Sequence, residues 1–239
     1  MYGKEAELDS MKKYYSWLWF DADGTLFDYV SAEAIALQKT FHSLRLPFQD
    51  EYLDIYKRIN HQLWQALEQQ KITPAVLQFR RFELLLESLQ LSASHEQMSG
   101  VYMEQLAICA ELMDGALEVL QTLQKKYRLA IVTNGLRAVQ RSRFAHSVIK
   151  DFISDIIISE EIGVAKPQAA FFEIAASRLG NPDKKDILII GDSLTSDIQG
   201  GVNYGIDTCW YNPTHETKPD ELLLTYEISH LKELLEILE

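Results

Sequence analysis

Residues 14–25 read YYSWLWFDADGT, a short apolar and aromatic run that stops abruptly at Asp21. The length of the run and its large aromatic side chains predict a buried β-strand from Tyr14 to Phe20. Asp23-Gly24-Thr25 then predicts a turn, because glycine and small polar residues end regular structure. A buried strand therefore carries two carboxylates at its carboxyl end.

Strand and helix patterns alternate from about residue 116 onward. Continuous apolar runs, typical of strands that are covered on both faces, occupy 129–133, 156–158, 187–190 and 208–211. Helical patterns occupy 116–126, 138–149, 169–179, 197–204 and 231–238. This alternation predicts an α/β fold with a parallel, doubly wound, Rossmann-like sheet.

The segment 31–111 lacks strand-like runs, and its apolar residues recur at helical spacing instead. Pro74 directly after Thr73 suits a capped helix start. We interpret residues 31–111 as an inserted α-helical cap of about four helices. The catalytic core would then comprise 12–30 and 112–239, and the polar residues 1–11 a poorly ordered N-terminal extension.

The composition excludes several classes of partner. The 239 residues carry a formal net charge of −12, which disfavours nucleic-acid polymers and anionic membranes. The apolar run near the start is too short for a membrane span or a signal peptide. The spacing of the two cysteines, Cys109 and Cys209, matches neither a zinc site nor a disulfide framework. We expect a cytoplasmic protein, monomeric or dimeric, with a small-molecule substrate.

Acidic and small polar residues follow three of the predicted strands. Asp21 and Asp23 follow the first, and Thr133-Asn134-Gly135 follows the second. Gly191-Asp192-Ser193 follows the fourth, with Asp197 beyond it. Because ligands bind outside the carboxyl ends of strands in open α/β sheets, we expect these residues to converge. Clustered carboxylates need a divalent cation, and all-oxygen ligands favour Mg²⁺.

Each of these residues taken alone has a structural explanation. Asp21 suits a helix cap or a turn, and Asp192 and Asp197 suit the start of a helix. Lys166 taken alone would be a solvated surface lysine. What favours a chemical role is their joint occurrence in this order, with the acidic groups at predicted strand ends.

Four ordered segments resemble the motifs of the haloacid dehalogenase-like phosphohydrolase superfamily: DADGTL at 21–26, IVTNG at 131–135, VAKP at 164–167, and GDS at 191–193 with Asp197. The resemblance covers residues 12–239 and implies a Mg²⁺-dependent phosphatase. By this resemblance, Asp21 is the nucleophile that forms an aspartyl-phosphate, and Asp23 is the general acid and base. The hydrolytic dehalogenases of the superfamily lack a carboxylate at the Asp23 position, so Asp23 favours phosphate esters.

The same resemblance implies the binding roles. Mg²⁺ would be held by Asp21, the backbone carbonyl of Asp23, and Asp192. The phosphoryl group would be held by Thr133, Asn134, Gly135 and Lys166. Ser193 and Asp197 would surround these groups, with Asp197 orienting water or Lys166.

Within the superfamily, the chain is most similar to the pyrimidine 5′-nucleotidases, or house-cleaning nucleoside monophosphatases, through segments such as WFDAD at 19–23 and SEEIGVAKP at 159–167. This resemblance implies nucleoside 5′-monophosphates as substrates. In the cap, Asn60, Trp64 and Arg81 are candidate contacts to the base or ribose. Helix packing is the alternative for Trp64, and a cap-stabilising ion pair is the alternative for Arg81.

Other functions remain open at this point. Sugar-phosphate and phosphoglycolate phosphatases share all four motifs, and they are the main alternative. A binding module with an inactive site is a second alternative, which the intact motif residues disfavour. A dehalogenase is a third, and halide release from a short haloacid would identify it.

Overall fold

The computed structural model describes residues 13–239, and the predicted N-terminal extension at 1–11 lies outside these residues. A six-stranded sheet in the order β3-β2-β1-β4-β5-β6 forms the centre, and every neighbouring pair is parallel. The strands are β1 (Trp17–Phe20), β2 (Arg128–Thr133), β3 (Asp155–Ile158), β4 (Ile187–Gly191), β5 (Asp207–Tyr211) and β6 (Tyr226–Ile228). The predicted α/β fold with a parallel, doubly wound sheet is confirmed.

The central strand β1 is buried on both faces, which explains its continuous apolar sequence. Leu18 and Phe20 belong to the core on one face of the sheet, and Trp17 and Trp19 belong to the core on the other. Fully burying a large apolar side chain stabilises the fold by about 1.5–3 kcal/mol. The strand that leads into Asp21 is therefore firmly anchored.

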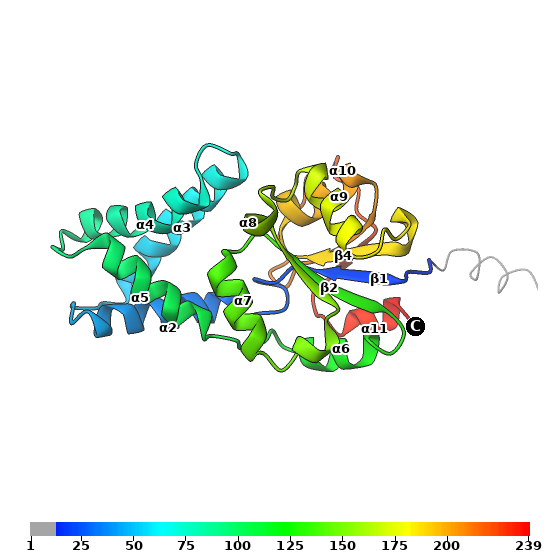
Figure 1. The fold of residues 1–239 in the computed structure, drawn as a ribbon, viewed down its shortest axis with the longest axis horizontal. Coiled ribbons are helices and arrows are strands. Elements are labelled where there is room, and N and C mark those ends of the chain that lie inside the picture. Colours follow the sequence, from blue (N-terminus) through cyan, green and yellow to red (C-terminus); the bar gives the residue numbers. More distant parts are fainter. Residues whose placement is uncertain (1–12) are drawn as a thin grey trace, which may run out of the picture.

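Helices cover both faces of the sheet (Figure 1). The face that carries Leu18 and Phe20 packs against α6 (Ala116–Leu123) and α11 (Glu233–Ile237), and the opposite face packs against α9 (Ala169–Arg178) and α10 (Gln199–Tyr204). Two further helices follow strands β2 and β3: α7 (Arg137–His146) and α8 (Ser159–Ile162). Short 3-10 turns occupy Lys150–Phe152 and Lys184–Asp186, and a π-helical turn occupies Leu194–Ile198.

Four helices form a cap beyond the carboxyl ends of the strands (Figure 1). They are α2 (Tyr29–Ser43), α3 (Glu51–Glu68), α4 (Pro74–Leu89) and α5 (His95–Ala107). Their own apolar core contains stacked Tyr56 and Phe82, whose ring centroids are 5.6 Å apart. Helix α4 begins as its sequence predicts, because Thr73 accepts a hydrogen bond from the Val76 amide.

Two chain crossings connect the cap to the core, and they run side by side. The Asp28 amide donates to the Glu111 carbonyl at 3.0 Å, and the Met113 amide donates to the Leu26 carbonyl at 2.9 Å. Helix α7 adds a further contact, because Leu136 at its start packs within the apolar core of the cap. The cap is thus attached beside the residues that follow β1.

The structure differs from the sequence prediction in several elements, and the first strand begins at Trp17 rather than at Tyr14. Strand β6 and helix α8 were not predicted, because three residues and one helical turn are too short to show a periodic pattern. The helix predicted over 197–204 begins earlier, as the π-helical turn at 194. No helix within residues 13–239 is both long and apolar enough to cross a membrane.

Candidate active site

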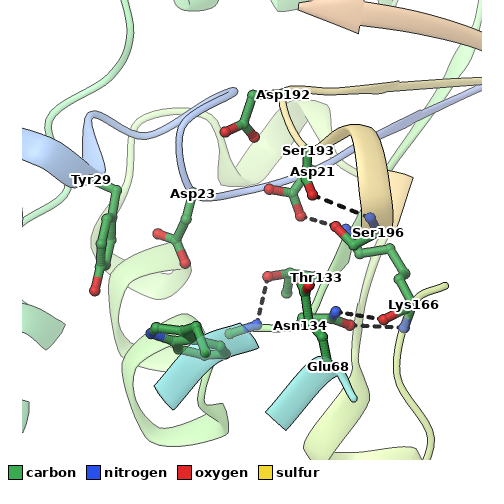
Figure 2. A pocket seen from close by; sticks show the side chains of 12 residues that line it. Asp21, Asp23, Tyr29, Glu68, Thr133, Asn134, Lys166, Asp192, Ser193 and Ser196 are labelled. Carbon is green, nitrogen blue, oxygen red and sulfur yellow. Dashed lines mark hydrogen bonds and ion pairs between the residues drawn. The ribbon is translucent and has the colours of Figure 1, made fainter. Parts of the chain in front are cut away.

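One cavity of about 240 Å³ lies where the strands meet the cap. Nine predicted site residues line it: Asp21, Asp23, Trp64, Thr133, Asn134, Gly135, Lys166, Asp192 and Ser193. The remaining lining residues are Tyr29, Glu68 and Ser196. In Figure 2 the carboxylates of Asp21, Asp23 and Asp192 surround the same space.

Adjacent strands explain why residues far apart in sequence meet here. Strand β1 lies between β2 and β4, so Asp21, Thr133 and Asp192 end neighbouring strands. The Asp21 amide also donates to the Ile190 carbonyl at 2.8 Å, which extends the sheet pairing to the carboxylate itself. The position of the Asp21 backbone is therefore set by the sheet.

Lys166 is buried beneath this carboxylate, with 1% of its side chain exposed. Its Nζ donates to Asp21 Oδ1 at 2.5 Å, to Asp197 Oδ1 at 2.6 Å and to the Val132 carbonyl at 2.7 Å. Burial alone would lower the pKa of Lys166, but the Asp197 and Asp21 carboxylates raise it above its ordinary value. Lys166 therefore stays charged and fixes one oxygen of Asp21.

The loop that carries Lys166 is tied to the end of β2 by Asn134. The Asn134 Nδ2 donates to the Lys166 carbonyl, and the Lys166 amide donates to Asn134 Oδ1, both at 2.9 Å (Figure 2). Beside this pair, the Gly135 amide donates to Thr133 Oγ1 at 3.0 Å. The Thr133 hydroxyl keeps its own hydrogen as a donor.

Three carboxylates form a cluster that a cation fits. One oxygen each of Asp21, Asp192 and Asp197 lies within 4.8 Å of the others, and among residues 13–239 Lys166 is the only cationic side chain that lines the cavity. Burial raises the pKa of Asp21 well above its ordinary value, and burial and Asp197 raise the pKa of Asp192 to about 7. Once all three are ionised, three carboxylates against one ammonium leave two negative charges, which a divalent ion would balance.

Hydrogen bonds decide which of these carboxylates is available to a metal. Asp197 uses both oxygens, one on Lys166 and the other on the Ser193 amide at 3.1 Å. Asp192 uses one oxygen, which accepts from the Thr25 hydroxyl at 3.1 Å. Asp21 and Asp192 thus suit metal ligation, and Asp197 suits holding Lys166.

Glycines let the carboxylates approach the backbone closely. Gly24 has φ +83°, and a Cβ at that position would lie 2.6 Å from Asp192 Oδ2. A Cβ on Gly191 would overlap the Asp197 carboxylate. Both positions therefore need glycine, the first for its backbone conformation as well as for space.

The Asp23 carboxylate has partners that the sequence analysis missed. It forms an ion pair with Arg143 and accepts a hydrogen bond from the side-chain amide of Gln140. Both residues lie on α7. The Arg143 side chain has no exposed surface and lies over the Phe27 ring, 5.3 Å from its centroid. The sequence does indicate that Gln140 and Arg143 need buried partners, because both continue the apolar face of α7.

The structure separates the three candidate substrate residues of the cap. Trp64 lines the cavity, whereas Asn60 and Arg81 are buried inside the cap and do not line it. Asn60 Nδ2 donates to Glu33 at 2.8 Å and to the Tyr29 hydroxyl at 3.2 Å. In this structure, Asn60 therefore reaches the cavity only through Tyr29.

Arg81 is held within the cap by longer contacts than those of Asn60. Its guanidinium packs against the rings of Phe82 and Tyr102, 5.1 and 4.8 Å from their centroids, and donates to Asn60 Oδ1 at 3.4 Å. A direct contact of Asn60 or Arg81 with substrate would need these buried side chains to move. Tyr29 and Glu68 lie on the cavity wall instead, and the sequence analysis did not propose them.

Comparison with known proteins places the chain in a family. Residues 16–205 match the haloacid dehalogenase-like hydrolase model. YfnB of Bacillus subtilis, named as a HAD hydrolase, is 38% identical over 95% of this chain and 97% of its own. Its crystal structure, bound to magnesium, has a TM-score of 0.89 and covers 95% of this chain and 99% of that one.

Two further relatives carry a named activity. The pyrimidine 5′-nucleotidase YjjG of Escherichia coli is 34% identical over 94% of this chain and 98% of its own. The pyrimidine 5′-nucleotidase PynA of Streptococcus pneumoniae is 35% identical over 95% of this chain and 96% of its own. The chain belongs to the haloacid dehalogenase-like hydrolases, as its four motifs predict.

Proposed function

We propose that this haloacid dehalogenase-like hydrolase is a Mg²⁺-dependent phosphomonoesterase that cleaves pyrimidine nucleoside 5′-monophosphates to nucleoside and phosphate. One observation carries the proposal. Lys166 holds one oxygen of a buried carboxylate, Asp21, at a cavity that Asp23 and Asp192 also line. This arrangement presents a nucleophile, a proton-transfer group and metal ligands to a single phosphoryl group.

The proposed reaction assigns one role to each of these groups. An oxygen of Asp21 attacks phosphorus, the bond to the ester oxygen breaks, and Asp23 gives that oxygen a proton. Asp23 then takes a proton from water, whose oxygen attacks the aspartyl-phosphate, and phosphate leaves while Asp21 is regenerated. Thr133 and the amides of residues 134–135 would bind the phosphoryl oxygens, with the Gly135 amide exchanging its bond to Thr133 Oγ1 for one to the substrate.

The metal would be held by Asp21, Asp192 and the backbone carbonyl of Asp23. When bound, it would neutralise charge on the phosphoryl oxygens. Asp197 would keep Lys166 in place, because their atoms are 2.6 Å apart in the buried site. The magnesium in the YfnB crystal structure supports this assignment.

The cap residues that line the cavity favour a leaving group that is uncharged and partly aromatic. Tyr29 and Trp64 can contact a base or ribose, and Glu68 would repel a second anionic group. An adjoining cavity of about 730 Å³ shares Trp64, Glu68 and Asn134 with the first, and this volume suits a ligand of nucleoside size. The named activity of YjjG and PynA supports the same substrate class, whereas phosphoglycolate would bring a second anionic group into a cavity whose wall carries Glu68.

Phosphate release across nucleoside mono-, di- and triphosphates, hexose phosphates and phosphoglycolate tests the substrate. We expect pyrimidine monophosphates to have the highest kcat/KM, and release to stop in excess chelator. Asp21→Asn should form no phosphoenzyme after rapid acid quench and intact-mass analysis. Asp23→Asn should accumulate phosphoenzyme from an aryl phosphate, because water then lacks its base. A phosphoryl group on Asp21→Asn, or full activity in chelator, would refute the mechanism.

A further inference from the structure

We propose that Arg143 and Gln140 are positioning residues that hold the Asp23 carboxylate in place for proton transfer, an assignment that rests on the proposed function. Arg143 Nη1 pairs with Asp23 Oδ1, and Gln140 Nε2 donates to Asp23 Oδ2. Both oxygens of the carboxylate are thereby fixed, which sets its plane as well as its position.

The burial of Arg143 makes a purely structural role costly. Its side chain is fully buried, and Asp23 is its single acidic partner among residues 13–239. Its Nε and Nη2 have no hydrogen-bond partner within that part of the chain. An apolar residue at such a position is often as stabilising as a buried ion pair or more so. A charged residue at this position therefore indicates that Arg143 acts on the Asp23 carboxylate. The Asp23 side chain is 25% exposed and lines the cavity.

Gln140 reaches Asp23 only because residue 135 is glycine. A Cβ on Gly135 would overlap the Gln140 side chain, including its Nε2 and Cγ atoms. Gly135 thus combines a backbone amide near the phosphoryl site with space for a side chain that contacts the acid and base. The absence of a side chain after strand β2 therefore lets α7 place Gln140 against Asp23.

An amide suits a group that must both give and take a proton. Gln140 Nε2 donates to the carboxylate, as in this structure. Gln140 Oε1 is buried and has no partner in the described chain, so rotation of the side-chain amide would let it accept a hydrogen bond from protonated Asp23 between the two proton transfers. Neither half of the reaction then requires Asp23 to leave its position.

Two esters with different leaving groups test the assignment. Uridine 5′-monophosphate has an alkoxide leaving group that needs a proton, whereas an aryl phosphate needs little protonation. Gln140→Ala should lower kcat for the nucleotide by about tenfold or more, and it should leave the burst of phosphoenzyme and aryl alcohol from the aryl ester within about threefold of the native rate. Arg143→Lys, which keeps the charge but not the planar guanidinium over the Phe27 ring, should lie between Gln140→Ala and the native protein.

The Asp23→Asn background separates positioning from general structural damage. If Gln140 acts through Asp23, adding Gln140→Ala to Asp23→Asn should change the nucleotide rate by less than about twofold. Arg141→Ala is the matched control, because Arg141 lies on the same helix and pairs with Glu161 at 2.6 Å, away from Asp23. It should leave both ester rates unchanged.

The outcomes are distinguishable. Equal losses in the rate of phosphoenzyme formation for both esters in Gln140→Ala, or an undiminished loss in the Asp23→Asn background, would overturn the positioning role while leaving the phosphatase proposal standing. Failure of the native protein to cleave either ester would overturn the proposed function, and this assignment with it. Circular dichroism melts of each variant confirm that rates are compared between folded proteins.

Discussion

Replacing Lys166 by methionine removes the charge beneath Asp21 and keeps most of the side-chain volume. The change leaves the Asp21 and Asp197 carboxylates buried without their cation, which is 2.5 and 2.6 Å from them in the native protein. Removing one partner of a buried ion pair costs about 3–5 kcal/mol. With a urea m-value of about 2 kcal/mol/M, the unfolding midpoint should fall by roughly 2 M.

The size of this loss should depend on pH. Burial raises the pKa of Asp21, and Lys166 opposes that rise, so Lys166→Met should raise the pKa further. A carboxyl with a raised pKa in the folded state destabilises the fold once pH exceeds its ordinary pKa, and the penalty grows until the folded-state pKa is passed. The destabilisation should therefore be larger at pH 8 than at pH 5.

Urea unfolding in chelator at both pH values measures this effect. The matched control is Lys232→Met, since Lys232 pairs with Glu118 at 2.7 Å but has 55% of its side chain exposed. The control should leave the midpoint nearly unchanged. With Mg²⁺ present, Lys166→Met should also lose at least about a hundredfold in kcat. A midpoint shift no larger than that of the control, or near-native turnover, would refute this role for Lys166.

Three other predictions follow from the same geometry. Because the pKa of Asp192 is about 7, its proton must leave before Mg²⁺ binds, so the Mg²⁺-induced rise in Tm should grow from pH 6 to pH 8; a constant rise would contradict this. Gly191→Ala should destabilise the protein by about 1–3 kcal/mol, since its Cβ would overlap Asp197, whereas Gly100→Ala, on an open helical position, should stabilise it by about 0.5–1 kcal/mol. Glu68→Gln should raise kcat/KM for phosphoglycolate relative to uridine monophosphate about fivefold or more, and an unchanged ratio would show that Glu68 does not select against anions.

The sequence predicted the core better than the cap, for a physical reason. Strand ends in a parallel sheet converge by topology, so Asp21, Thr133 and Asp192 could be placed together from their positions after apolar runs. Helical spacing in the cap carries no such information. It indicates which side of a helix is buried but not whether that side faces the cap interior, as Asn60 does, or the cavity, as Trp64 does.

The partners of Asp23 show what a sequence pattern can still reveal. Leu136, Val139, Gln140 and Arg143 follow the spacing i, i+3, i+4 and i+7, which places them on one face of α7. The first two pack into the core of the cap, so the same face should be buried where it continues. Two polar residues on a buried helix face need partners, because an unpaired buried guanidinium is very costly. The pattern thus predicts that an acidic partner exists but not which one, since Asp23 lies 117 and 120 residues away in the chain. Only the fold, which brings α7 beside the turn after β1, identifies it.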